Sequence, residues 1–435
     1  MTGTHLSDLA IVGRSMRARL FSTLTTILMV AIAVALMLTL LALRDASKEA
    51  FQRGTGNMHY LISADQSPLV SVLNGIFYAN PPARPIEWPK FNQLVRTAPW
   101  AFFIPVQQGD SYQGFPVLAT TPEFFTSFEP NNGEPWAFAQ GRAFDKPFEV
   151  VVGSTAASTT GLKPGDTIYL THGIASSRQL GPANAMEPHV HTEFTYTIVG
   201  ILDPTGSAHD RALFTDLDST WIIHAHDRRK RDDPSIRTTA LEDLTDADRK
   251  ITGIYTRVAT RPGSDASPAM VQAAARLRAD PSITIASPSD EIKRLFTIVS
   301  SIDQVFIAMA VVVIVSSSIS IMLALYNSMD QRRRQIAVLR VLGSSRLRIS
   351  RLVLAESAIL GLLGSALGVA ISIVGGQAGA SVLRAYLGIF LEPGINLAPT
   401  LLVCASTVAL AMLAGLVPSF VAYRTPVARN LKPIA

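Results

Sequence analysis

Histidine is the residue type whose spacing in this chain points most directly to chemistry. Six of the eight histidines fall within 55 residues, where uniform scatter would place about one. Two pairs have the form His-x-His, which puts both imidazoles on one face if the segment is a strand. Imidazole together with nearby carboxylates suits Zn²⁺ or another divalent metal. The pattern predicts a metal site with the candidate ligands His172, His189, His191, His209, His224 and His226.

A solvated polar loop explains the same histidines without any ligand role. Neither pair, His189 with His191 or His224 with His226, is accompanied by a third ligand at a fixed spacing. Such spacing is what makes a zinc motif specific. Both interpretations therefore stay open. In the first interpretation, the chain is a metal-responsive binding or sensing module, either by itself or as part of a metal-linked transporter.

Motifs for nucleotide hydrolysis and nucleophilic catalysis do not occur in the sequence. There is no GxxxxGK[ST] phosphate loop, no GxSxG elbow, no HExxH helix and no paired CxxC. The single cysteine, Cys404, has no partner for an internal disulfide. We expect a chain that is not an enzyme and that holds no cofactor of its own other than the candidate Zn²⁺.

The apolar stretch 352–374, which is long enough to span a membrane, contains one carboxylate and several glycines. A carboxylate in a membrane segment is costly and usually has a partner or a role. We expect Glu356 to pair with Arg351 or to reach the membrane interface. Gly361, Gly364 and Gly368 are three and four residues apart. Small residues at such a spacing let helix backbones approach closely. They therefore predict tight packing of this helix, within one protomer or across a dimer.

Composition indicates a membrane protein, because 48% of the residues are hydrophobic and only 16% are charged, against about 25% charged in soluble domains. A membrane helix needs ~20 apolar residues. Four stretches meet this requirement: 20–43, 304–326, 352–374 and 397–421. The first contains 24 residues without a charge, longer than the roughly 7–15 residues of a signal-peptide core, which favours a retained helix.

Charge placement predicts the orientation of these helices. The segments 1–19, 328–351 and 422–435 together hold 13 basic and 2 acidic residues, whereas residues 44–294 hold 24 basic and 28 acidic residues. Basic flanks stay on the cytoplasmic side. We expect a multi-pass protein of the inner (plasma) membrane with both termini in the cytoplasm and a large domain outside. The net charge of +5 is then a topology signal, and no nucleic-acid partner is expected.

The large domain, residues 44–303, shows mostly strand signals. Segments of alternating or β-branched residues end at Gly and Pro turns, which predicts strands at 148–153, 167–170, 194–202 and 283–286. Residues 270–277 predict a helix, residues 227–250 a surface excursion, and residues 44–59 and 288–303 a helical stalk. The predicted fold is an α+β membrane protein with four transmembrane helices in a 1+3 arrangement and a large extracytoplasmic α+β domain on that stalk, with 119–244 as a candidate inserted subdomain.

The remaining connections are short: a cytoplasmic segment at 327–351 and an extracytoplasmic loop at 375–396. In the cytoplasmic segment, apolar residues recur at three-residue steps until a glycine that ends a helix. Such a helix with basic flanks docks into a groove on a partner, or lies on the inner leaflet as a charged anchor. Its candidate residues are Arg334, Gln335, Ile336, Leu339, Arg340, Leu342 and Gly343.

The run QRRRQIAVLRVLGSSRLRI, residues 331–349, resembles the signature RRREIAxLRALGAS of the FtsX-like permease family, which includes MacB, LolC/LolE and FtsX. Gln335 stands where the family commonly has Glu, and Val341 where it has Ala. The end of the chain, 413–431, is similar to the family's GLxPAxRAAR ending. Residues 150–153 with 162–168 resemble the MacB-type periplasmic core domain.

The resemblance implies the permease subunit of an ATP-binding cassette transporter of the mechanotransmission type. A separate cytoplasmic ATPase would bind ATP and grip the helix within 331–348, and the stalk would transmit its closure to the outside domain. The implied task is efflux or extraction of a substrate such as a lipoprotein, a peptide or a small molecule. The implied partners are the ATPase, a second permease in a homodimer or a heterodimer, the lipid bilayer, and a periplasmic adaptor or lipoprotein.

Overall fold

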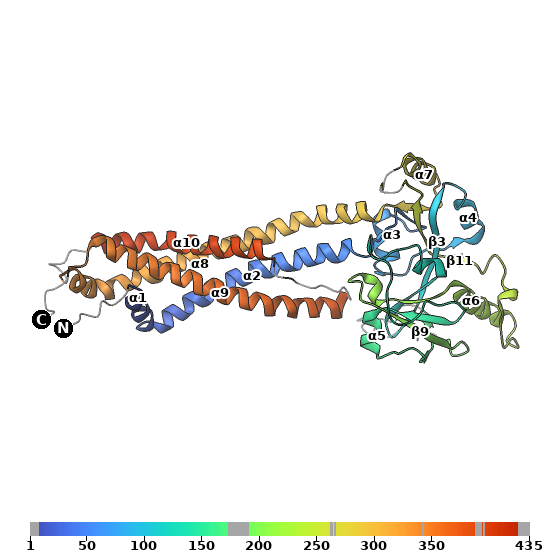
Figure 1. Cartoon of the computed structure of the whole chain (residues 1–435), viewed down its shortest axis with the longest axis horizontal. Coiled ribbons are helices and arrows are strands. Elements are labelled where there is room, and N and C mark those ends of the chain that lie inside the picture. Colours follow the sequence, from blue (N-terminus) through green and yellow to red (C-terminus); the bar gives the residue numbers. More distant parts are fainter. Residues whose placement is uncertain are drawn as a thin grey trace. The chain divides into compact units, whose positions relative to one another are not determined.

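A computed structural model describes residues 8–172, 191–261, 264, 267–341, 343–387, 394 and 396–424 (Figure 1). The chain divides into two compact units. The helical unit comprises Met1–Ser47, Val299–Tyr386 and Leu391–Ala435, and the mixed unit comprises Lys48–Ile298 and Leu387–Phe390.

In the described residues, five helices contribute to the helical unit. They are α1 (Asp8–Arg17), α2 (Leu20–Gln52), α8 (Pro288–Val341), α9 (Arg346–Leu387) and α10 (Leu397–Arg424). Four helical segments in the described part of the chain are long and apolar enough to cross a membrane: Leu20–Gln52, Pro288–Asn327, Arg346–Val382 and Leu397–Arg424. The predicted four spans and their 1+3 arrangement are confirmed.

Apolar residues from all five helices form the core of the helical unit. Val12 of α1, Val34 of α2, Ile321 of α8, Leu360 of α9 and Ala411 of α10 are all buried in one cluster. Other large apolar side chains on the four long helices are exposed. Such an outward apolar surface is what a helix presents to lipid, since lipid tails are as apolar as leucine.

The mixed unit is built on one large sheet. Its order is β13-β1-β12-β3-β4-β10-β6-β9-β5, with β7 paired to β9 and β8 paired to β3, and β11 and β2 form a separate pair. The strands are β1 (Tyr60–Ser63), β2 (Ile86–Glu87), β3 (Trp100–Tyr112), β4 (Phe115–Thr120), β5 (Phe138–Gly141), β6 (Glu149–Val152), β7 (Thr167–Ile168), β8 (Thr171–His172), β9 (Tyr196–Leu202), β10 (Leu213–Asp216), β11 (Lys250–Ile251), β12 (Gly253–Val258) and β13 (Thr284–Ala286).

Short helices complete the mixed unit. They are α3 (Pro68–Gly75), α4 (Trp88–Leu94), α5 (Ser154–Thr160), α6 (Leu217–Asp232) and α7 (Pro268–Arg278), with 3-10 turns η1 (Pro122–Phe125), η2 (Ala208–Arg211) and η3 (Leu241–Asp243). The sheet is packed on both faces. Leu61 and Ile62 are neighbours on β1 yet belong to different buried clusters, as expected where successive side chains point to opposite faces.

Most of the predicted elements of this unit are present, with two corrections. The strands expected at 148–153, 194–202 and 283–286 appear as β6, β9 and β13, the helix at 270–277 lies within α7, and the strand at 167–170 ends at Ile168. The helix expected over 44–59 ends at Gln52, because Gly54 and Gly56 adopt positive φ angles of 86° and 59° that interrupt a right-handed helix.

The second correction concerns residues 227–250, expected as a surface excursion. Its first part belongs to α6, which begins where the Asp216 side chain accepts a hydrogen bond from the Asp218 backbone. Arg229, Lys230 and Arg231 lie in its last turn, where cations favour the helix dipole. The subdomain boundaries at 119 and 244 stay predictions.

Candidate functional site

A buried ion pair lies in the helical unit, at the junction of α1 and α2. The Glu356 side chain on α9 is 4% exposed and accepts a hydrogen bond of 2.8 Å from Arg19 Nη2. Arg19 also donates to Ser15 Oγ at 3.3 Å. The pair therefore ties the start of α2 to α9.

The predicted pairing of Glu356 with Arg351 is wrong. Residues on one helix face each other when they are three or four positions apart, and these two are five apart. Arg351 is exposed, whereas Glu356 is buried and faces Arg19 of another helix. The partner of Glu356 is therefore Arg19, which is distant in the sequence, and not the nearby Arg351.

The glycines of α9 allow close helix packing within the protomer. A Cβ atom at Gly364 would lie 2.5 Å from Val30 Cγ1, and one at Gly368 would lie 2.7 Å from Val34 Cβ. Both valines are on α2. A Cβ at Gly361 would lie 2.9 Å from Ala411 Cβ on α10. These close approaches join α9 to α2 and α10 of the same chain.

A second close approach escaped the sequence analysis. A Cβ at Gly415 of α10 would lie 2.1 Å from Ser357 Oγ of α9. Ser357 follows Glu356 directly and donates to the Val353 carbonyl at 3.1 Å. The contact holds α10 against the same turn of α9 that carries the buried carboxylate.

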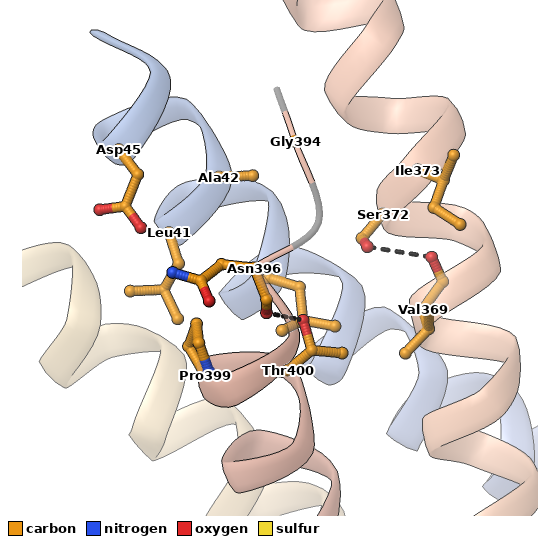
Figure 2. Close-up of a pocket in the computed structure, with 11 residues that line it drawn as sticks. Leu41, Ala42, Asp45, Val369, Ser372, Ile373, Gly394, Asn396, Pro399 and Thr400 are labelled. Atoms are coloured by element: carbon orange, nitrogen blue, oxygen red, sulfur yellow. Dashed lines mark hydrogen bonds between the residues drawn. The ribbon is translucent and has the colours of Figure 1, made fainter. Parts of the chain in front are cut away.

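A small pocket lies between α2, α9 and α10 (Figure 2). Apolar residues and a few polar ones line it, among them Asp45, Ser372, Asn396 and Thr400. The two hydroxyls bond to carbonyls of their own segments, Thr400 to Asn396 at 2.8 Å and Ser372 to Val369 at 3.0 Å. Both hydroxyls are therefore engaged with the backbone of their own segments.

The predicted docking segment is helical as far as the structure describes it. The backbone of α8 runs to Val341, and Gly343 adopts a φ of 94°, the left-handed conformation that commonly ends a helix. Ala337 is buried and Val341 is exposed. Leu342 and the side chains of Arg334, Gln335, Ile336 and Leu339 lie outside the described residues.

The six clustered histidines separate into different environments. His172, His191 and His224 gather, with ring centroids 6.2 Å apart for His172 and His191 and 5.3 Å apart for His172 and His224. His189 lies outside the described residues. His209 and His226 lie elsewhere, and their assignment to one metal site with the other histidines is wrong.

His209 belongs to the aromatic core of the mixed unit. It is fully buried among Phe124, Phe128 and Trp136. Its Nδ1 atom lies 2.7 Å from the Tyr78 hydroxyl, and its Nε2 atom lies 3.3 Å from the Gly54 carbonyl. Burial lowers the pKa of His209 to about 4, so the imidazole is neutral near pH 7. Both nitrogens are occupied by protein partners, which leaves no ligand atom for a metal.

His224 and His226 lie on helix α6 and not on a strand. Residues two apart on a helix diverge by about 200°, so the two imidazoles do not share a face. His226 Nδ1 contacts Thr239 Oγ1 at 3.1 Å. Of these two histidines, only His224 lies beside His172.

An aspartate on β3 completes the group around His172. His172 Nδ1 donates to Asp110 Oδ1 at 3.0 Å, and candidate ligand atoms of Asp110, His172 and His224 all lie within 4.8 Å of one another. The hydrogen bond to Asp110 raises the pKa of His172, whereas burial lowers the pKa of His224. The two histidines thus lie in different surroundings, His172 beside a carboxylate and His224 in the interior.

Comparison with known protein families assigns both halves of the chain. Residues 23–277, more than half of the chain, match the family of MacB-like periplasmic core domains. Residues 307–427 match the family of FtsX-like permease C-terminal regions. The chain belongs to the FtsX-like, MacB-type family of ABC transporter permeases. The resemblance seen in its sequence motifs is confirmed.

Two further comparisons place this permease less closely. Among solved structures, it is similar to the extracellular domain of the ABC-type transporter YknZ from Gram-positive bacteria, with 7% identity and a TM-score of 0.27 over 52% of this chain and 98% of that one. No curated protein sequence matches it.

The matched regions locate the candidate sites within the permease architecture. Glu356, the glycines of α9 and the helical segment 331–341 fall within the FtsX-like region, whereas Asp110, His172 and His224 fall within the MacB-like region. Arg19 and Asp110 were not predicted as partners of Glu356 and His172. A signal for Asp110 exists, since Gln107–Ser111 is a polar run inside a long strand in which Gln107, Gln108, Asp110 and Ser111 are all buried.

Proposed function

We propose that this permease couples a separate cytoplasmic ATPase to its extracytoplasmic MacB-like domain, by mechanotransmission along helices. The observation that carries the proposal is α8, a single helix of 54 residues from Pro288 to Val341. The helix α8 contains residues 288–298 of the mixed unit, a candidate membrane span and the first part of the signature run 331–349. A helix without a break transmits displacement along its length, because its backbone hydrogen bonds run continuously.

The two helix ends in the mixed unit support this proposal. Ile292 of α8 is buried in the aromatic core of that unit, and Leu295 and Phe296 pack against it. Phe51, near the end of α2, contacts Phe296 and Phe77 with ring-centroid distances of 5.8 and 4.9 Å. The ends of α2 and α8 are thus anchored together in the domain that they would move.

The cytoplasmic end of α8 is the proposed docking site for the ATPase. The basic flanks and apolar steps of 331–342 suit a groove on a partner, and the positive-inside rule places this segment and both termini in the cytoplasm. In this proposal ATP is bound by the partner subunit. The permease acts as a dimer in the inner membrane, on a substrate that is exported or extracted, such as a lipoprotein, a peptide or a small molecule.

The test is ATPase coupling in lipid nanodiscs. The full chain is reconstituted with its ATPase, and the ATP hydrolysis rate is compared with that of Ile336→Ala/Leu339→Ala. We expect the double variant to reduce hydrolysis to the rate of the ATPase alone, because it removes the apolar steps of the docking helix. Leu401→Ala is the control, since Leu401 is an exposed apolar residue on α10 and lies outside the segment 331–348. Unchanged coupling in the double variant would contradict the proposal.

A further inference from the structure

Three potential metal ligands converge in the mixed unit from elements far apart in the sequence. Asp110 comes from β3, His172 from β8 and His224 from α6. Strand pairing fixes two of them, because β8 pairs antiparallel with β3 in a register that places His172 opposite Asp110. Their candidate ligand atoms and one from His224 all lie within 4.8 Å of one another.

The burial of the Asp110 carboxylate and of a His224 ring nitrogen favours a bound cation between them. The Asp110 side chain is only 2% exposed, and a buried carboxylate needs a cation or several hydrogen bonds to offset its desolvation. The Nε2 atom of His224 is buried and has no hydrogen-bond partner in the described part of the chain. A buried imidazole nitrogen without a partner beside a carboxylate and a second imidazole is a ligand atom ready for a metal.

Gln107 can fix His224 in the required tautomer. Its amide lies 3.2 Å from His224 Nδ1, and its Oε1 atom is buried without a partner. Rotation of the amide by 180° exchanges oxygen and nitrogen. Oε1 then accepts a hydrogen bond from Nδ1–H, which leaves the lone pair on Nε2. Metal-binding histidines are typically oriented by such a second hydrogen bond.

Two more side chains extend the group. Asp227 lies one turn beyond His224 on α6, and its Oδ2 atom is 3.8 Å from Nδ1 of the buried His191. The His191 ring lies 6.2 Å from that of His172. The surroundings thus add further negative charge and a third imidazole, which favour a divalent cation over a monovalent one.

We propose that Asp110, His172 and His224 form a Zn²⁺-binding site in the extracytoplasmic domain, with Gln107 as a positioning residue. Two imidazoles and a carboxylate are a ligand set found at zinc sites that keep a fourth position open. Ligands around tetrahedral Zn²⁺ lie roughly 3.3–3.6 Å apart, so the side chains must close by about 1 Å. The His172 side chain is 56% exposed, and the metal can therefore exchange with solvent.

Zn²⁺ binding to the full chain tests the site. The protein is purified in detergent through a tag without histidine, treated with a chelator, and titrated with Zn²⁺ against a chromophoric competitor. We expect one Zn²⁺ per chain. His172→Ala/His224→Ala should abolish this binding, Asp110→Asn should raise the Kd at least 10-fold, and Gln107→Leu should raise it about 10- to 100-fold.

A matched control and a folding check keep the test decisive. His226→Gln removes a histidine from the same helix but outside the group, and it should leave the Kd within twofold. Zn²⁺ should raise the melting temperature of the wild type and of this control, because a ligand that binds the native state stabilises it. The isosteric Asp110→Asn gives an independent answer if the double variant fails to fold.

Two results would overturn the proposal. One is the absence of stoichiometric Zn²⁺ in the wild type. The other is an equal affinity for Zn²⁺ in the wild type and in His172→Ala/His224→Ala. Zn²⁺ binding that is lost only in His189→Ala would be one such result. The site does not depend on the ATPase, so failure here would leave the proposed coupling function untouched, and failure of coupling would leave the site untouched.

Discussion

At the scale of single residues, the Arg19–Glu356 pair illustrates how this permease keeps a carboxylate inside a candidate membrane helix. The carboxylate is buried, and its hydrogen bond to Arg19 is 2.8 Å long. Removing one partner of a buried pair leaves an uncompensated charge, which costs more than the intact pair contributes. The two residues should therefore be replaceable together more easily than one at a time.

We predict that Arg19→Met destabilises the helical unit by about 3–5 kcal/mol, because the buried Glu356 then loses the hydrogen-bonded cation at 2.8 Å. Arg19→Met/Glu356→Met should recover much of this loss. Cys404, the single cysteine, lies on α10 in the helical unit and is partly buried, so its reaction with a thiol-specific fluorophore during heating reports the unfolding of this unit.

Arg351→Met is the matched control, since it removes an exposed arginine five residues before Glu356 and leaves the ion pair intact. It should leave the melting temperature almost unchanged. Additive effects of the two single substitutions at Arg19 and Glu356 would contradict an energetic coupling between them.

His209 gives the mixed unit a defined response to acid. Burial lowers its pKa from 6.5 to about 4. Between these values the unfolded chain binds a proton that the folded chain does not, so stability falls as the pH decreases from 6.5 towards 4 and levels off below. The full effect of this group is about 3 kcal/mol.

We predict that the stability difference between the wild type and His209→Gln shrinks by about 3 kcal/mol between pH 7 and pH 4, because glutamine does not titrate. All four tryptophans lie in the mixed unit at positions 88, 100, 136 and 221, so tryptophan fluorescence of the full chain reports this unit alone. Parallel pH curves for the two proteins would show that His209 is not the group responsible.

At the scale of elements, glycines set how closely α9 packs. Gly364 and Gly368 face Val30 and Val34 of α2 so closely that a Cβ atom would lie within 2.7 Å of a valine carbon. Real Cβ contacts are longer, so even alanine would push the helices apart. Overpacking of this kind typically costs about 1–3 kcal/mol.

We predict that Gly364→Ala lowers the melting temperature of the helical unit, measured by the reactivity of Cys404. Gly375→Ala on the same helix is the control, because its Cβ would meet only Thr39 Oγ1 at 3.6 Å, an ordinary contact. It should be neutral or stabilising, since alanine favours a helix by about 1 kcal/mol over glycine. Equal melting temperatures for the two variants would contradict close packing at Gly364.

The sequence was most informative where one physical signal dominates. Long apolar runs predict membrane helices, and alternation predicts strands such as β9. The helix α6 was missed because charged residues dominate its second half and obscure the period of its buried face. The stalk was extended too far, because the turn after Gln52 depends on the positive φ angles of Gly54 and Gly56.

The candidate sites were predictable only in part, for a related reason. His172 and His224 are recognisable as ligand types, but Asp110 and Arg19 become partners only through strand register and helix packing over long separations. His209 has the same chemistry as the other histidines and lies close to them in sequence. Tertiary burial alone distinguishes it, since it packs in an aromatic core.

At the scale of the whole molecule, the permease combines a helical unit with four candidate spans and a mixed unit with a large sheet. The helices α2 and α8 each contain residues of both units. The proposed coupling depends on α8, and the proposed metal site depends on Asp110, His172 and His224. We therefore expect substitutions to remove either property without the other.

If α8 couples the ATPase to the extracytoplasmic domain, that domain must move when ATP is bound. A spin label on Ala275→Cys, an exposed position of α7, is introduced into a Cys404→Ser background. The full chain is reconstituted with its ATPase in nanodiscs, and distances between the labels of the proposed dimer are measured by pulsed electron resonance without nucleotide and with trapped ATP. We predict different distance distributions in the two states, and no change between the states in Ile336→Ala/Leu339→Ala. Identical distributions while the complex hydrolyses ATP would contradict the proposed coupling.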